Sequence, residues 1–354
     1  MAEVRSMLRV LLLGSLFVVG ATAQTLATVP TLTTFQDVDR PLAGGVGRYQ
    51  QWYAASDLDD YLPEPMRIDR VEFFAGSGPS AIATTIDCEI LLGHGQTFGV
   101  TGSFDNNFAS APVVVAPRTN RQLTAGAPGA VVMNIPFATL FTWDRQRPLL
   151  MEIRVYGNGQ ANQPFSYTFR GSTVAFGKTS RVYQAGSTGA ATGTVASNTG
   201  MLTRFTARPG ALVDFGAGCV GGGGFTPKNV ILEVPQPGIL WTHQLTQAAP
   251  QQLALWVIGA DRNMIDGIPL PIDFPQLLGT GPSGCMLRTN IIVSGFHVTV
   301  GGAPGAGFAT FSWQLPPIGN YVGDHWYSQW FVLDPICPNG LLTATQGIES
   351  IVAP

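Results

Sequence analysis

Charged side chains are scarce in this sequence. They make up 12% of its 354 residues, about half of the roughly 25% that is typical of soluble proteins. Lys178 and Lys228 are the only lysines, and the formal net charge is −3. Nucleic-acid binding requires a clustered basic surface, which this chain lacks. Polybasic membrane contact is excluded for the same reason, so we expect no nucleic-acid partner.

Helical patterns and long apolar runs are also missing. Beyond the first 24 residues no apolar run approaches the roughly 18 residues of a membrane-spanning helix. No stretch shows three turns of amphipathic helix. Hydrophobic residues nevertheless reach 45%, with 43 glycines and 26 prolines, so the chain can bury a core and turn often. This combination is typical of all-β proteins.

The N-terminus has the pattern of a secretory signal peptide over residues 1–23. Arg5 and Arg9 provide the positive charge, Val10–Gly20 is the apolar run, and an Ala-Thr-Ala site precedes Gln24. An uncleaved anchor is the alternative, which the small-residue cleavage site disfavours. We therefore expect a mature chain without a transmembrane segment, either secreted or held at the cell surface.

Alternation of apolar and polar residues predicts many short strands. Residues 149–158 are an example, with four apolar residues on one face: Leu149, Met151, Ile153 and Val155. This period of two indicates a strand with one face buried. Residues 84–95 alternate in the same way, and the pattern places Cys88 on the inner face.

A break in this pattern at Pro209 and Gly210 predicts a domain junction. After the signal peptide we expect two tandem β-sandwich domains, of jelly-roll or immunoglobulin-like type. The first would comprise residues 24–210 and the second residues 211–354. The predicted fold class is therefore all-β.

The sequence of the glycine-rich stretch DFGAGCVGGGGFTP, residues 214–227, matches the glycine spacing of dinucleotide-binding loops. Gly216, Gly218 and Gly221 have the spacing G-x-G-x-x-G. Such a loop must open a helix whose N-terminus faces the pyrophosphate. More glycines and Pro227 follow instead, and both oppose a helix. We expect a structural loop and no nucleotide.

Four cysteines occur in a chain that the signal peptide sends to an oxidising compartment. Cys219 and Cys285 both lie in glycine-rich corners, where the backbone can approach closely, and we predict a disulfide between them. A metal site is disfavoured, because no C-x-x-C or neighbouring histidine occurs. Cys88 is expected to be a buried free thiol. Cys337 would be unpaired or joined to another chain, and a bridge between Cys88 and Cys337 is the remaining alternative.

Four ordered motifs within residues 213–353 carry a resemblance: FGAGCVGGGGFTP, GIPLPIDFPQLLGTGPSGCML, FSWQLPPIGN and QWFVLDP. Together they resemble a module found at the C-termini of many secreted proteins of environmental bacteria. Less specifically, RYQQWYAAS and FTWDRQRPLLMEIRVYGN resemble a β-rich domain of secreted and surface-associated bacterial proteins. The resemblance implies architecture and compartment but no chemistry. Cysteines like Cys219 and Cys285 belong to the module, whereas Cys337 departs from it.

No catalytic constellation is evident in the sequence. The four histidines have no metal-ligand spacing, and G-x-S-x-G is absent. We expect His243 and His297 to face solvent or to be hydrogen-bonded. The carboxylates considered for a glycosidase lie in turn-like contexts where Asp orders the backbone: Asp57, Asp59, Asp60, Asp261 and Asp266. We therefore expect a protein that is not an enzyme.

Two short clusters of oxygen-bearing side chains could bind calcium, residues 56–60 (SDLDD) and 104–108 (FDNNF). Neither matches an EF-hand loop, and turn formation is the simpler interpretation. We expect no other cofactor.

Aromatic residues are the best candidates for contact with a ligand. Trp326 and Trp330 share one face of a predicted strand, which is either core or a stacking platform for sugar rings. Tyr49, Trp52 and Tyr53 raise the same question more weakly. The leading hypothesis is a non-catalytic exported protein with a structural or surface-interaction role. A carbohydrate-binding protein comes second and a β-sandwich glycoside hydrolase third, with a cell-envelope or extracellular polysaccharide or protein as the partner.

Overall fold

The computed structural model describes residues 24–31, 34–174, 177–273, 284–317 and 321–354. The predicted signal peptide lies outside the described residues. The chain is an all-β sandwich built from antiparallel sheets, and the described part contains one short helix, α1 (Ala55–Leu58). No helix in these ranges is long and apolar enough to cross a membrane.

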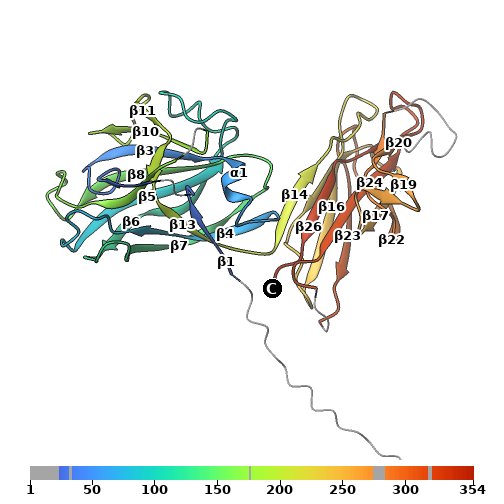
Figure 1. Ribbon diagram of the computed structural model, residues 1–354. Coiled ribbons are helices and arrows are strands. Elements are labelled where there is room, and N and C mark those ends of the chain that lie inside the picture. The colour runs from blue at the N-terminus through green and yellow to red at the C-terminus, as the bar shows by residue number, and fades with distance from the viewer. Residues whose placement is uncertain (1–23, 32–33, 175–176, 274–283, 318–320) are drawn as a thin grey trace, which may run out of the picture.

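Strands from the first 208 residues form three sheets (Figure 1). The four-stranded sheet has the order β1 (Thr25–Val29), β13 (Thr203–Arg208), β4 (Met66–Phe74) and β7 (Val131–Trp143). The six-stranded sheet has the order β11 (Thr194–Ser197), β10 (Thr179–Ala185), β3 (Gly47–Tyr53), β8 (Leu149–Asn158), β5 (Thr84–His94) and β6 (Val113–Leu123). The three-stranded sheet has the order β12 (Thr199–Met201), β9 (Phe169–Thr173) and β2 (Thr34–Val38).

Strands after residue 210 form two larger sheets and two short pairs. The six-stranded sheet follows the path β14 (Ala211–Phe215), β26 (Gly347–Ile351), β24 (His325–Leu333), β17 (Leu253–Gly259) and β22 (Val293–Val298), with β25 (Leu342–Ala344) paired to β24. The three-stranded sheet has the order β15 (Lys228–Ile231), β16 (Leu240–Ala248) and β23 (Gly307–Gln314). The pairs are β18 (Met264–Ile265) with β19 (Ile268–Pro269), and β20 (Ile272–Asp273) with β21 (Met286–Leu287).

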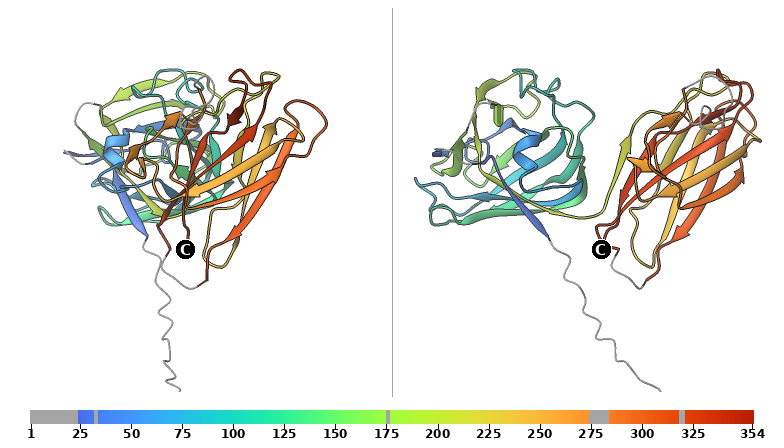
Figure 2. Two further views of the ribbon diagram at one scale, coloured as in Figure 1. Left: turned by 90° about the vertical axis from the view of Figure 1, so that its right-hand side faces the viewer. Right: turned by 45° about the vertical axis from the view of Figure 1, so that its right-hand side comes forward.

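The two groups of strands form separate β-rich parts, here called the N-part (residues 25–208) and the C-part (residues 211–351). In the described ranges no sheet contains strands from both parts. The right-hand view of Figure 2 shows a single connection passing from β13 to β14. This change of sheet falls at the predicted junction of Pro209 and Gly210. Whether each part folds independently stays a prediction.

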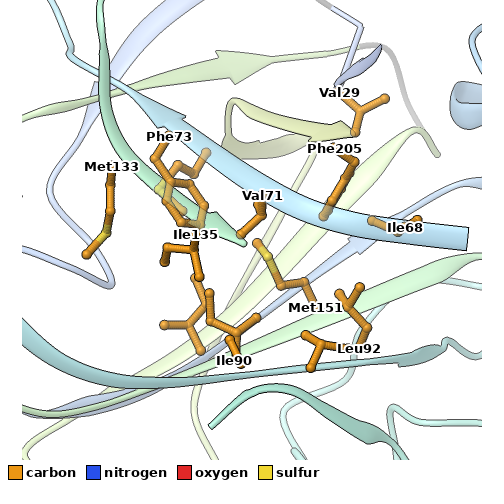
Figure 3. Packing of buried hydrophobic residues seen from close by; sticks show 14 of the residues in the cluster. Val29, Ile68, Val71, Phe73, Ile90, Leu92, Met133, Ile135, Met151 and Phe205 are labelled. Carbon is orange, nitrogen blue, oxygen red and sulfur yellow. The ribbon is translucent and has the colours of Figure 1, made fainter. Parts of the chain in front are cut away.

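The main core of the N-part lies between its four-stranded and six-stranded sheets (Figure 3). Val71 and Phe73 from β4 face Ile90 from β5 and Met151 from β8, and all four are almost completely buried. Cys88 lies in the same cluster as a free, buried thiol. Burial raises the pKa of its thiol to about 12, so Cys88 is an inert packing residue.

Strand β8 begins and ends at the predicted residues, but both of its faces are covered. The inner residues lie in the main core as expected. Leu150 and Glu152, on the other face, are also fully buried. The expectation of one solvated face was wrong here, because the loop between β5 and β6 folds back over this face of the sheet.

The core of the C-part is built around tryptophans. Trp256 on β17 and Trp330 on β24 are register partners, and both are fully buried. Trp241 on β16 faces them from the three-stranded sheet. Aromatic side chains of this size bury about 150–250 Å² each. They let a small sandwich fill its interior with few residues.

A disulfide joins Cys219 to Cys285, with Cα atoms 5.3 Å apart. It packs on the outer face of the C-part's six-stranded sheet, against Val257 and Leu342. Cys337 is a free and buried cysteine. The glycine-rich segment thus serves to bring Cys219 beside β25, where its N–H donates to the Ala344 carbonyl.

We expect Cys219 to be paired with Cys285 in the purified protein. The bridge closes an interval of 66 residues, and loop entropy then contributes on the order of 4 kcal/mol to the free energy of unfolding. The double variant Cys219→Ser/Cys285→Ser should lose about this amount in denaturant titrations. Non-reducing peptide mapping that links Cys219 to any other cysteine would contradict the assignment.

Replacing Trp330 by Ala should lower the free energy of unfolding by about 3–5 kcal/mol, the range for emptying a buried aromatic site. Trp326→Ala is the matched control on the same strand face. Its side chain is only partly buried, so it should cost less. Thermal and urea denaturation test this. Unchanged stability of Trp330→Ala would show that the ring is not a core residue.

Candidate functional site

A hollow of about 300 Å³ on the N-part brings together aromatic and neutral polar side chains. We call it the Trp52 hollow. Its described lining residues are Trp52, Thr97, Phe98, Gly99, Gly177, Thr179, Ser180, Ser197 and Asn198. Three segments that are distant in sequence meet here: β3, the loop after β5, and the β10–β11 region. None of these described residues is ionisable.

Phe98 is the most exposed large hydrophobic residue described, with 98% of its surface accessible. It lies in the loop between β5 and β6, beside the rim of a hollow whose Trp52 is only 5% exposed. The Trp52 indole N–H donates to the Gln96 carbonyl at 2.7 Å. Gly95 permits this close approach, since a Cβ there would lie 2.7 Å from the Trp52 ring.

Some polar side chains of the hollow already form hydrogen bonds within the fold: Thr179 donates to the Trp52 carbonyl and Ser180 accepts from the Val100 N–H. The Asn198 side-chain oxygen Oδ1 accepts from the Gly177 N–H, whereas the hydroxyls of Thr97 and Ser197 form no hydrogen bond in the described part of the chain. Asn198 has a left-handed backbone with φ of 58°, which Asn tolerates better than most residues. A ligand would therefore meet the free hydroxyls of Thr97 and Ser197 beside the exposed Phe98 ring, with the Trp52 ring almost entirely covered.

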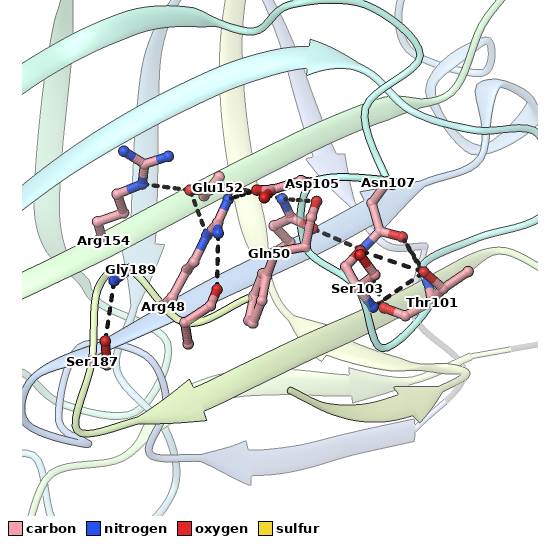
Figure 4. Close-up of polar contacts among 12 residues, drawn as sticks. Arg48, Gln50, Thr101, Ser103, Asp105, Asn107, Glu152, Arg154, Ser187 and Gly189 are labelled. Carbon is pink, nitrogen blue, oxygen red and sulfur yellow. Dashed lines mark hydrogen bonds and ion pairs between the residues drawn. The ribbon is translucent and has the colours of Figure 1, made fainter. Parts of the chain in front are cut away.

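The loop that carries Phe98 is held by a buried ionic network (Figure 4). Glu152 on β8 is fully buried and accepts from Arg48 at 3.0 and 3.1 Å and from Gln50 at 2.6 Å. Arg154 donates to the same carboxylate at 2.5 Å. Arg48 also pairs with Asp105 in the loop at 2.9 Å. Burying a carboxylate is costly unless it is paired and hydrogen-bonded in this way.

The network reaches the loop through amide side chains. Gln50 donates to the Phe104 carbonyl, and Asn107 donates to the Gln50 side chain. Asn107 in turn accepts from the Thr101 N–H at 2.7 Å. Phe104 is fully buried below the Arg48 guanidinium. The loop is thus fixed before any ligand arrives, which lowers the entropy cost of binding.

Of the tryptophans singled out in the sequence, neither offers a stacking platform like that of Phe98. Trp330 is fully buried. Trp326 is partly exposed and packs edge-on against Trp313, with ring centroids 5.4 Å apart. Trp52 was a weaker candidate, and Phe98 and Asn198 carried no signal of their own. The only hint was the position of Phe98 in a glycine-flanked loop.

The two oxygen-rich clusters serve the fold. Asp57 is buried in α1 and accepts from the Thr31 N–H at 2.9 Å. In the second cluster Asp105 is paired with Arg48, and Asn107 is buried. Within the described ranges no three His, Cys, Asp or Glu side chains are placed to hold a metal ion.

The histidine expectation fails at His243. This residue is fully buried between Trp241 and Trp256, with ring centroids 4.4 and 5.0 Å away. Neither ring nitrogen has a hydrogen-bond partner among the described residues. Strand alternation placed His243 beside polar neighbours, but it could not show that this face is covered by the opposing sheet.

The glycine-rich segment makes no phosphate loop. It is followed by strand β15, whereas the phosphate loop requires a helix there. Gly222 donates its N–H to Asp334 at 2.6 Å, which ties the segment to the end of β24. Among the carboxylates considered for hydrolysis, Asp59 pairs with Arg145 and Asp261 accepts from the Asn263 N–H.

A scan of the sequence against models of known protein families finds no match, and a search of curated proteins finds none either. The resemblance to secreted bacterial modules therefore stays a prediction.

Stability should fall on acidification because of His243. Burial lowers its pKa to about 3, whereas an unfolded chain would titrate near 6.5. The unfolded state thus binds more protons between these values, and stability decreases as pH falls from about 6.5 to 3. His243→Leu should show a shallower decrease in urea titrations. His297→Leu is the comparison for a less buried ring, since His297 is partly buried and burial also lowers its pKa. Equal slopes in wild type and His243→Leu would contradict this.

Proposed function

We propose that this protein is a non-catalytic, exported binding protein that interacts with an uncharged carbohydrate through the Trp52 hollow. The observation that carries the proposal is the composition of the lining: two aromatic rings with hydroxyl and amide groups and no ionisable side chain among the described residues. Sugar rings present apolar C–H faces and hydroxyl edges. The hollow offers a partner for each.

Exposure of Phe98 supports the same proposal. The phenyl ring is 98% accessible, so its apolar surface is in contact with water. Covering this surface with a ligand would be favourable. Its loop is fixed by the Glu152 network, so the ring is presented without a large ordering cost. Pockets of about 300–1,000 Å³ with aromatic walls and few polar groups are typical of small-ligand sites.

Absence of acid–base groups in this lining supports a binding role over hydrolysis. Glycoside hydrolysis uses two carboxyl groups on either side of the bond that is cleaved. The described lining of the Trp52 hollow supplies none. A structural role at the cell surface remains compatible with such binding, because attachment to a polysaccharide would itself anchor the protein.

Phe98→Ala should abolish retention on a neutral polysaccharide, with at least about tenfold weaker binding, equal to about 1.4 kcal/mol. Cellulose, chitin and β-1,3-glucan are suitable insoluble probes, with alginate as the acidic comparison. Phe296→Ala, which removes another exposed phenyl ring, 69% accessible and in the C-part, is the matched control. Both variants should keep the wild-type melting temperature, since neither ring is buried. Wild-type protein that no neutral polysaccharide retains, or equal retention of Phe98→Ala, would overturn the proposal.

A further inference from the structure

A polar cleft of about 700 Å³ lies where the N-part and the C-part meet. The N-part contributes Pro63, Glu64, Pro65, Asp144, Arg145 and Gln146, and the C-part contributes Arg262, Asn263, His325, Tyr327 and Glu349. Charges of both signs line it. This cleft is independent of the Trp52 hollow and of the proposed function.

His325 is the residue that connects the two parts across this cleft. Its Nδ1 lies 2.7 Å from Oε1 of Glu349, on β26 of the C-part. Its Nε2 lies 3.1 Å from Oε2 of Glu64, in the loop before β4 of the N-part. One imidazole ring is therefore placed between two carboxylates from different parts of the chain.

The chemistry of the ring makes this arrangement proton-dependent. An ionised carboxylate can only accept hydrogen bonds, and a neutral imidazole has one N–H donor and one acceptor nitrogen. Both contacts are hydrogen bonds at once only when both ring nitrogens carry protons. A neutral ring would direct a lone pair at one of the two carboxylates, which is repulsive.

The other charged groups around the cleft have partners of their own. Glu349 also accepts from Arg262 at 3.1 Å and from the Tyr327 hydroxyl at 3.2 Å. Asp144 and Arg145 pair with residues of the N-part itself. The contact between Glu64 and His325 is thus the ion pair that spans the cleft in the described structure.

We propose that doubly protonated His325 clamps the N-part to the C-part in the orientation seen here, and that loss of one proton releases the clamp. Hydrogen bonds to Glu349 and then to Glu64 raise the pKa of His325 to about 9. An unfolded or separated chain would titrate near 6.5. The clamp therefore contributes fully below pH 6.5, and its contribution is lost as pH rises through about 9.

Titration of the His325 ring by NMR in the full-length protein tests the clamp. Wild type should titrate near pH 9. Glu64→Gln keeps the shape of the side chain but removes one carboxylate, so the pKa should fall by roughly one unit. Glu233→Gln, which removes an exposed charge elsewhere in the C-part, should leave it unchanged. A wild-type value near 6.5, or no change in Glu64→Gln, would overturn the proposal.

Small-angle X-ray scattering tests the consequence for shape. The maximum dimension of the wild-type protein should increase between pH 7 and pH 10, whereas His325→Gln should already have the larger dimension at pH 7. Glu64→Gln should behave like His325→Gln. Because the Glu64 side chain is partly exposed, we expect this variant to fold. Identical scattering of wild type and both variants at pH 7 would show that His325 does not hold the parts together.

Discussion

The buried carboxylate of Glu152 is the constraint on which the proposed binding surface depends. A charge with no exposed surface in the middle of a β-sheet is tolerated only because Arg48, Arg154 and Gln50 all donate to it. Removing one partner of such a buried pair typically costs about 3–5 kcal/mol. The network therefore fixes the side chains of β3 and β8, and through them the loop that covers this face.

A chain of contacts connects this network to the loop. Hydrogen bonds of Gln50 and Asn107 hold the loop backbone against the sheet, and Phe104 is buried beneath the loop. Phe98, which this loop contributes to the lining of the Trp52 hollow, faces solvent. A rigid scaffold with an exposed aromatic is how proteins bind weakly polar ligands without a large ordering cost.

Charged residues are few in this protein, and two of their ion-pair clusters connect different elements of the architecture. Only 12% of the residues are charged. Arg48 pairs with Glu152 on the neighbouring strand and with Asp105 in the loop, and His325 contacts Glu64 of the other part of the chain. Elsewhere the fold relies on apolar packing, with the fully buried rings of Trp256 and Trp330 side by side on neighbouring strands. The chain can thus be poor in charge and still have fixed geometry at the places where contacts with a partner are proposed.

The sequence by itself determined the local features of this protein. Alternation is a property of neighbouring residues, so it predicted the all-β class and the bounds of β8, and it placed Cys88 inward. The glycine-rich corners pointed to the bridge between Cys219 and Cys285 in the same local way.

Only the tertiary structure decided which surfaces are covered and which residues meet. The second face of β8 and the side chain of His243 are buried by segments far away in the chain. Trp52, Phe98 and Asn198 share a hollow because strand pairing brings three distant segments together. A period of two in the sequence fixes the side of a strand on which a residue lies. It contains nothing about the partner on that side, because long-range pairing is set by the packing of the whole chain.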